Sequence, residues 1–128
     1  MKRANCFCKA VIIEVEGEPE NVRVCHCRAC QKSMGAPFLA RALFKQSNIM
    51  LSGETKRHSS AEGLDRVFCP KCGTTLGAWR NDGTVAGVSL AVFEDRDAFA
   101  PTEHIWVSEK MVWVEVSDGL PQFAEGKQ

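Results

Sequence analysis

The chain alternates between short apolar segments, rich in β-branched and aromatic residues, and polar stretches that contain turn-forming residues. Short apolar segments bounded by turn signals are typical of β-strands. The pattern predicts strands at Val11–Glu16, Val22–Cys25, Phe38–Phe44, Asn48–Leu51, Arg66–Cys69, Thr75–Trp79, Thr84–Leu90 and Met111–Val116. The residues Asn81-Asp82-Gly83 join two of these segments and predict a β-hairpin. We therefore expect a mainly β protein.

One segment has the features of a short helix. Arg28–Met34 follows the central cysteines and is ended by Gly35 and Pro37. A chain of 128 residues has the length of one domain, and no linker composition interrupts it. We therefore expect a single domain over residues 1–128, with a polar tail at 124–128 that frays.

The balance of charges and the length of the apolar stretches argue against some classes of partner. Sixteen Lys and Arg residues balance sixteen Asp and Glu residues, so the basic excess of a general nucleic-acid binder is missing. No apolar stretch of signal-peptide length follows Met1, and the longest apolar run, Val85–Phe93, is about half as long as a membrane-spanning helix. We expect a soluble, cytoplasmic protein with no nucleic-acid partner and no membrane partner.

Cysteine is the residue whose number stands out. Seven cysteines cannot all pair in internal disulfides, and in a reducing compartment clustered cysteines are more often metal ligands or redox groups. They form three groups: Cys6-x-Cys8, Cys25-x-Cys27-x-x-Cys30 and Cys69-x-x-Cys72. The last group precedes Gly73 and has the form of a zinc knuckle. The spacing therefore predicts metal sites.

Seven thiols divide into a closed site of four and an open set of three. The Cys6-x-Cys8 and Cys69-x-x-Cys72 pairs make a tetrahedral structural zinc site, which leaves a trio with a vacant fourth position. The spacing equally permits Cys27-x-x-Cys30 to join Cys69-x-x-Cys72, so it fixes the partition more firmly than the pairing. Two zinc ions per chain are expected in either case.

A zinc ion held by three thiolates suits sulfur chemistry better than hydrolysis, because the thiolate charge weakens its acidifying effect on a bound water. We expect a thiol substrate to occupy the vacant position, lose its proton and add reversibly to an aldehyde carbon. Two alternatives stay open. His26, His58 or His104 completes a second structural site, or the trio is a redox cluster without metal.

Several neighbours of the trio have candidate roles. Arg28 and Lys32 lie four residues apart on the predicted helix, where they either bind a substrate carboxylate or remain solvated charges. His26 stands between two cysteines on an extended segment, so we expect its ring to point away from the metal. His104 is expected to be hydrogen-bonded packing, and Trp113 to build the core or a pocket wall.

Six motifs follow one another over most of the chain: Cys6-Phe7-Cys8, Cys25-His26-Cys27-Arg28-Ala29-Cys30, Gly35-Ala36, Phe68-Cys69-Pro70-Lys71-Cys72-Gly73-Thr74-Thr75-Leu76, Pro101-Thr102-Glu103-His104-Ile105-Trp106 and Pro121-Gln122-Phe123. This series resembles the glutathione-dependent formaldehyde-activating enzyme family, which also includes centromere protein V. The family commonly has glycine after its first Cys-x-Cys, where this chain has Lys9. It commonly has a basic pair after the second cysteine group, where this chain has Gln31-Lys32.

The resemblance implies a fold, two metal sites and a reaction. The implied fold is the β-tent (Mss4-like) arrangement of zinc-bound antiparallel β-sheets with one short helix. A structural zinc is implied on the Cys6/Cys8 and Cys69/Cys72 pairs, and a catalytic zinc on Cys25, Cys27 and Cys30. The implied activity is that of a carbon-sulfur lyase that joins glutathione and formaldehyde reversibly as S-hydroxymethylglutathione. The expected partners are therefore a small thiol such as glutathione and a small aldehyde.

Two other classes of function stay open in the sequence. The resemblance to centromere protein V suggests a zinc-stabilised binding module without catalysis. A trio of thiols is also typical of a redox sensor, which would form a disulfide under mild oxidation.

Overall fold

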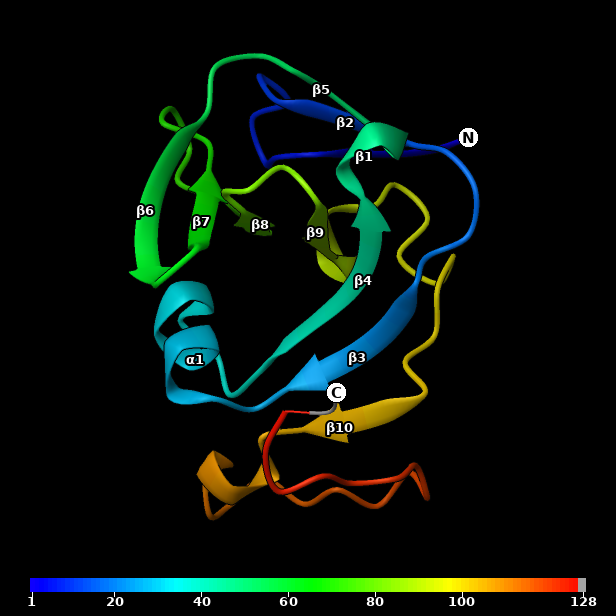
Figure 1. Ribbon diagram of the computed structural model, residues 1–128, viewed down its shortest axis with the longest axis vertical. Helices are drawn as coiled ribbons and strands as arrows, with labels where there is room; N and C mark the ends of the chain where they lie inside the picture. Colours follow the sequence, from blue (N-terminus) through cyan, green and yellow to red (C-terminus); the bar gives the residue numbers. More distant parts are fainter. Residues whose placement is uncertain (127–128) are drawn as a thin grey trace.

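A three-stranded sheet, a seven-stranded sheet and one short α-helix make up the computed structural model, which describes residues 1–126 (Figure 1). The strands are β1 (Lys2–Asn5), β2 (Ile12–Val15), β3 (Asn21–Cys25), β4 (Leu39–Lys45), β5 (Ile49–Ser52), β6 (Lys56–Ala61), β7 (Leu64–Phe68), β8 (Thr75–Arg80), β9 (Val85–Ser89) and β10 (Glu103–Ile105). The helix is α1 (Arg28–Met34), and the 3-10 helices are η1 (Gln46–Asn48), η2 (Leu90–Val92) and η3 (Val107–Glu109). The expectation of a mainly β fold with one short helix is confirmed.

The strand order is β1-β2-β5 in the small sheet and β10-β3-β4-β9-β8-β7-β6 in the large one. All strand pairs are antiparallel except β10 with β3, which pair in parallel. The expectation of antiparallel sheets is therefore corrected at this one edge of the large sheet. A long connection separates β3 from β10, and such a connection permits parallel pairing, which a hairpin does not. The large sheet curls, and α1 lies on its open side next to β6 and β7 (Figure 1).

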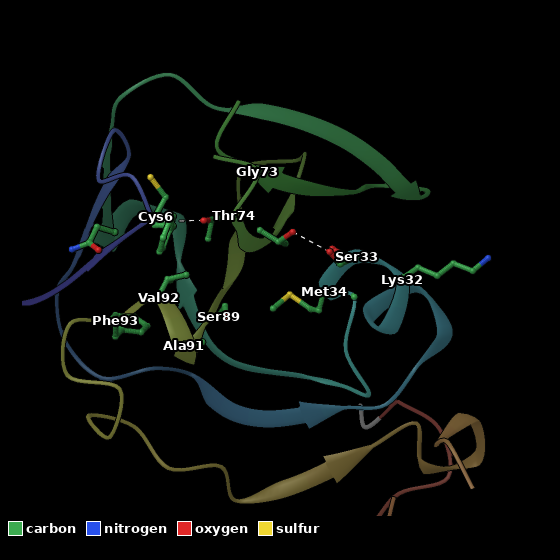
Figure 2. Close-up of a pocket in the computed structure, with 14 residues that line it drawn as sticks. Cys6, Lys32, Ser33, Met34, Gly73, Thr74, Ser89, Ala91, Val92 and Phe93 are labelled. Atoms are coloured by element: carbon green, nitrogen blue, oxygen red, sulfur yellow. Dashed lines mark hydrogen bonds between the residues drawn. The ribbon is translucent and has the colours of Figure 1, made fainter. Parts of the chain in front are cut away.

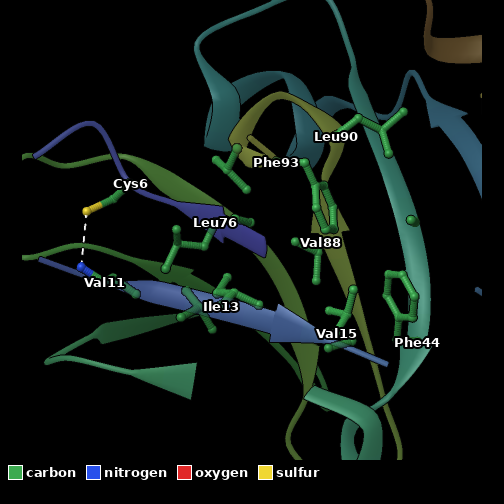
Figure 3. Packing of buried hydrophobic residues seen from close by; sticks show 14 of the residues in the cluster. Cys6, Val11, Ile13, Val15, Phe44, Leu76, Val88, Leu90 and Phe93 are labelled. Carbon is green, nitrogen blue, oxygen red and sulfur yellow. Dashed lines mark hydrogen bonds between the residues drawn. The ribbon is translucent and has the colours of Figure 1, made fainter. Parts of the chain in front are cut away.

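The main hydrophobic core lies between the small sheet and one face of the large sheet. Ile13 and Val15 of β2 pack against Phe44 of β4 and Val88 of β9, and all four are at most 1% exposed (Figure 3). Burial of a side chain of this size stabilises a fold by about 1.5–3 kcal/mol. The other face of the large sheet carries different residues, including Cys25. One face of this sheet is therefore available for a site.

The helix α1 is the predicted Arg28–Met34 segment, with identical bounds. The Sγ atom of Cys27 caps its first turn by accepting a hydrogen bond from the backbone N–H of Cys30 at 3.3 Å. Gly35 ends it in the left-handed conformation, with φ of 60°, where glycine has no steric cost. The cysteine motif itself thus begins the helix.

Seven of the eight predicted strands are confirmed within a few residues, as β2, β3, β4, β5, β7, β8 and β9. The hairpin predicted at Asn81-Asp82-Gly83 is also confirmed, because β8 and β9 flank it and pair antiparallel. The sequence pattern missed β1, β6 and β10. The strand β6 has almost no apolar residues, and its pattern of mostly exposed side chains belongs to an edge strand.

The strand predicted at Met111–Val116 is wrong. The backbone N–H of Val114 donates to the carbonyl of Met111 at 3.0 Å, which closes a turn instead. Val112 and Trp113 are 95% and 70% exposed, so Trp113 is not part of the core but lines a surface hollow, the other of the two places expected for it. Apolar residues alone do not make a strand where no neighbouring strand offers hydrogen bonds.

The end of the described chain is tied down. The carbonyl groups of Ala124 and Glu125, which the polar composition assigns to a fraying tail, accept hydrogen bonds from the backbone of Ser108 and Trp106 at 3.1 and 3.2 Å. Positions 127–128 of that expected tail lie outside the described residues. Within residues 1–126, no helix has the length and apolar character needed to cross a membrane.

We predict that Gly77→Ala destabilises the fold by about 3 kcal/mol, because a Cβ atom there would meet the backbone carbonyl of Gly87 on β9. Gly83→Ala is the matched control, since Gly83 also has positive φ, 82° against 149°, but nothing lies within 4 Å of its added Cβ. The control is expected to lose only about 1 kcal/mol. Urea unfolding of the zinc-loaded proteins measures both changes. Equal losses would contradict the close strand approach.

Candidate metal centres

The first cysteine set joins the N-terminal turn to the turn before β8. The four sulfur atoms of Cys6, Cys8, Cys69 and Cys72 lie within 4.8 Å of one another, with 3.6 Å between Cys6 and Cys8 and 3.8 Å between Cys8 and Cys69. Sulfur ligands about 2.3 Å from a tetrahedral zinc ion lie about 3.8 Å apart. The donor type, number and spacing therefore fit a structural zinc ion.

Two tight turns hold these sulfur atoms. The N–H of Lys9 donates to the carbonyl of Cys6 at 3.0 Å, and the N–H of Gly73 donates to that of Cys69 at 2.8 Å. Both turn residues have positive φ, 64° at Lys9 and 78° at Gly73. Glycine adopts a positive φ without steric cost, which explains why it is common at the position of Lys9 in the family that the cysteine motifs resemble. A hydrogen bond from Thr74 lowers the pKa of Cys72 to about 5, which favours the thiolate that zinc binds.

The first site is linked to α1. The hydroxyl of Thr75, which begins β8, donates to the carbonyl of Ser33 at 3.0 Å. Figure 2 shows the groove between the two elements, where Cys6 and Thr74 face Ser33 and Met34. The groove has a volume of about 770 Å³. The turn that carries Cys69 and Cys72 therefore supports the helix that follows the second cysteine group.

The second cysteine set is Cys25, Cys27 and Cys30, whose sulfur atoms also lie within 4.8 Å of one another. Cys25 ends β3, Cys27 caps α1 and Cys30 lies in its first turn. The structure thus groups the cysteines as four and three, and Cys27 and Cys30 do not join Cys69 and Cys72. Neither group includes a histidine among the described residues. The donor set of the trio fits a zinc ion with three protein ligands.

The surroundings of the trio favour a thiolate at Cys27, whereas the pKa values of Cys25 and Cys30 are raised. The guanidinium Nη1 of Arg66 donates to the Sγ of Cys30 at 3.4 Å, and both residues are buried. Hydrogen bonds from Cys25 and Cys30 lower the pKa of Cys27 to about 2, with a smaller contribution from the charge of Arg66. The same contacts raise the pKa of Cys25, because it is the donor. The chain itself therefore provides a cation against the charge of the trio.

The trio opens into a cavity of about 360 Å³ on the face of the large sheet opposite the main core. Four arginines line this cavity: Arg23, Arg41, Arg66 and Arg80. Sequence reasoning missed all of them. The signal for one was present, since Arg23 stands two residues before Cys25 and therefore faces the same side of β3. The others needed the strand order, which brings β4, β7 and β8 around the same cavity.

Arg28 and Lys32, the cations that the sequence proposed as substrate contacts, are not among the residues that line this cavity in the described chain. Both lie with Met111 and Trp113 along a separate surface hollow. The backbone N–H of Arg28 donates to Glu109 at 2.7 Å. Their proposed contact with substrate stays a prediction, and the geometry offers the cavity arginines in their place.

Two of the three histidines, His26 and His104, form a buried pair next to the trio, whereas His58 is exposed on β6. Nε2 of His26 lies 2.9 Å from Nδ1 of His104, and Nε2 of His104 lies 2.7 Å from the Asp118 carboxylate. Because the carboxylate only accepts, His104 donates to Asp118 and accepts from His26. Burial, followed by the charge of His104, lowers the pKa of His26, which favours its neutral form. This agrees with the expectation that His104 packs through hydrogen bonds, and His26 is not grouped with the sulfur atoms of the trio.

We predict different outcomes for loss of a ligand from each set. Cys72→Ala removes one of four structural ligands, and since structural zinc contributes on the order of 10 kcal/mol in small zinc peptides, this variant is expected to lose the fold at ambient temperature. Cys27→Ala is expected to lose one zinc ion and keep the fold. Zinc analysis and circular dichroism melting check both. A folded Cys72→Ala variant with full zinc content would contradict the structural role.

Asp118→Asn is predicted to loosen the C-terminal segment, because a neutral amide oxygen accepts a weaker hydrogen bond from His104 than the carboxylate does. The backbone groups of His104 and Phe123 pair next to this contact, so their amide hydrogens are expected to exchange faster. Asp95→Asn is the matched control, because Asp95 accepts a turn hydrogen bond from Asp97 without a histidine. Unchanged protection in Asp118→Asn would show that the contact does not hold the segment.

Comparisons with known proteins agree with this geometry. The chain is 31% identical over 72 residues to an uncharacterized lyase of Schizosaccharomyces pombe (strain 972 / ATCC 24843), an alignment that covers 56% of the chain and 53% of the relative. The chain thus spans about half the length of this curated relative. A Rhodobacter sphaeroides protein of known crystal structure shares the fold, with a TM-score of 0.61 and 24% identity, over 77% of this chain and 96% of that one.

A family model provides the assignment. The model described as glutathione-dependent formaldehyde-activating enzyme matches residues 1–109, which include both cysteine sets and β10. The match therefore extends over most of the chain and confirms the resemblance seen in the cysteine motifs. On this evidence the chain belongs to the glutathione-dependent formaldehyde-activating enzyme family.

Proposed function

We propose that this protein is a zinc-dependent carbon-sulfur lyase that acts reversibly on the adduct of a small thiol and a small aldehyde, of the S-hydroxymethylglutathione type. The observation that carries the proposal is the position of the trio: three cysteine ligands open into a cavity, while the other four cysteines complete a site of their own. Family membership and the lyase relative support the reaction class.

The proposed reaction balances without a further reactant. The thiol sulfur forms a bond to the aldehyde carbon, the π electrons of the carbonyl go to its oxygen, and the proton released by the thiol ends on that oxygen. The reverse direction breaks the same carbon-sulfur bond. Zinc on the trio would supply a soft Lewis acid that keeps a coordinating thiol deprotonated at neutral pH.

Residues of the chain position the reacting groups and keep water away from part of the trio. Cys25 and Cys30 lie in a small apolar cluster with Leu39 and Ile105, which shields two sulfur atoms of the trio from solvent. Trp106 packs against this cluster and lines the cavity. Because these apolar side chains exclude water, the attraction between the sulfur atoms of the trio and a cationic neighbour such as Arg66 is stronger than it would be in solvent.

We place this activity in the cytoplasm. All seven cysteines are free thiols in the structure, and a reducing compartment keeps thiols in the form that binds zinc. Glutathione, an abundant thiol, and formaldehyde, a small aldehyde, are the substrate pair proposed from the family.

The test is an exchange measurement at equilibrium. Adding the zinc-loaded protein to glutathione and ¹³C-formaldehyde is expected to speed the interconversion of free aldehyde and adduct, which NMR exchange spectroscopy detects. Cys27→Ser is expected to return the rate to the spontaneous value while the fold and the structural zinc remain. Ser33→Ala on the same helix is the control, since only the backbone carbonyl of Ser33 makes the contact with Thr75. Exchange at the spontaneous rate with fully zinc-loaded wild-type protein would overturn the proposal.

A further inference from the structure

The cavity of the trio carries an excess of positive charge. Four arginines line it, and among residues 1–126 no aspartate or glutamate does. Arginine is seldom buried without a partner, since removing its charge from water is costly. The partners of each arginine therefore show which positive charge the fold leaves uncompensated.

Two of the four arginines have partners that account for them. Arg23 lies 3.4 Å from the Glu103 carboxylate of the neighbouring strand β10. Arg66 donates to the Ser60 hydroxyl at 3.0 Å and to the sulfur of Cys30 at 3.4 Å. A third, Arg80, is exposed at the end of β8, where water solvates it. Arg41 is the remaining cation.

Arg41 is half-buried and has no carboxylate partner in the described chain, and the negative charges that act on it are those of Cys25 and Cys30. Its Nη1 donates to the side-chain oxygen of Asn21 at 2.8 Å, which is a neutral acceptor and uses one of five guanidinium N–H groups. Burial lowers the pKa of Arg41, which reports the cost of holding this charge away from water. Its side chain lies over Gly87, where an added Cβ would come within 2.5 Å of the Cδ of Arg41. Glycine at this position leaves the space that the arginine occupies.

The strand register places Arg41 close to the trio. Arg41 pairs with Arg23, and Cys25 stands two residues further along the same strand, β3. Neighbouring strands lie about 4.8 Å apart and two residues span about 6.6 Å, so the two Cα atoms are separated by about 8 Å. Both side chains face the same cavity. A small molecule whose sulfur reaches the trio therefore has its other end beside Arg41.

We propose that Arg41 binds a carboxylate of the thiol substrate and makes the cavity selective for thiols that carry a carboxylate over neutral and cationic thiols. A guanidinium with free N–H groups offers a paired contact to the two oxygens of a carboxylate. The inference rests on the proposed function, because it assumes that a thiol enters the trio. To that function it adds the residue that recognises the substrate, Arg41, and the charge of the thiols that the cavity selects.

The test compares three thiols of similar size that differ in charge: 3-mercaptopropionate, 2-mercaptoethanol and cysteamine. Isothermal titration of the zinc-loaded wild-type protein is expected to give the tightest binding for 3-mercaptopropionate. Arg41→Gln is expected to weaken this binding about tenfold or more and to leave that of 2-mercaptoethanol nearly unchanged. Comparing each ligand between wild type and variant cancels the differing acidities of the three thiols.

Two further variants make the result specific. Arg96→Gln removes an exposed arginine outside the cavity and is expected to bind all three thiols as wild type does. Gly87→Ala keeps the guanidinium but displaces its side chain, so it is expected to weaken binding of 3-mercaptopropionate selectively. Because Gly87 does not have positive φ, its backbone accepts alanine. Gly87→Ala therefore tests the role of Arg41 even if Arg41→Gln fails to fold.

The outcomes separate this inference from the proposed function. Equal affinity of the wild-type protein for the three thiols, or an Arg41→Gln variant that keeps the wild-type preference, overturns the role of Arg41 even if adduct exchange is catalysed. Selective binding that depends on Arg41, without faster adduct exchange, supports the carboxylate site and overturns the lyase proposal instead.

Discussion

Cys8 and Cys69 are 61 residues apart in the chain, yet their sulfur atoms lie 3.8 Å from each other. Among the described residues no hydrogen-bonded ladder connects the two sheets, since the isolated bridge of Ala4 in β1 is made with Phe93, which follows η2 and lies outside both sheets. Core packing and the cysteine contact hold the sheets together instead. Four close thiols without a metal would repel once ionised, and a divalent ion bound by them would turn that repulsion into a cross-link between the two segments.

This closure also positions the second cysteine set. The turn with Cys69 and Cys72 leads into Thr75, whose hydroxyl bonds to the carbonyl of Ser33 in α1. The same helix carries Cys30 and is capped by Cys27, so a shift of the first site would move two ligands of the second. On the opposite side, the chain from His26 through His104 to Asp118 fixes the strand that ends at Cys25 against β10. The open set of three is thus held from both sides.

Features that depend on residues close together in the chain could be predicted from the sequence. Features that depend on how distant strands are arranged could not. A Cys-x-Cys or Cys-x-x-Cys-Gly turn sets the distance between its own sulfur atoms, which is why the amino-acid sequence alone identifies the ligand groups. The helix is equally local, because its cap and its terminating glycine stand next to it in the chain. The arginines of the cavity are not, since Arg41 and Arg66 approach the trio only through the order and curl of strands distant in the chain. Met111–Val116 failed for the opposite reason: it has the apolar residues of a strand but no strand beside it.

The two faces of the large sheet show how this fold divides stability from chemistry. One face buries Phe44 and Val88 against the small sheet, and this apolar contact supplies stability. The other face places Arg41 and Arg66 at alternating positions where apolar residues would pack with less cost. Arg66 is compensated by the trio, and its charge is useful only when the sulfur atoms are thiolates. Arg41 is attracted by the charges of Cys25 and Cys30 but has no carboxylate partner within the described chain, so a ligand that brings its own anion into the cavity would complete its contacts.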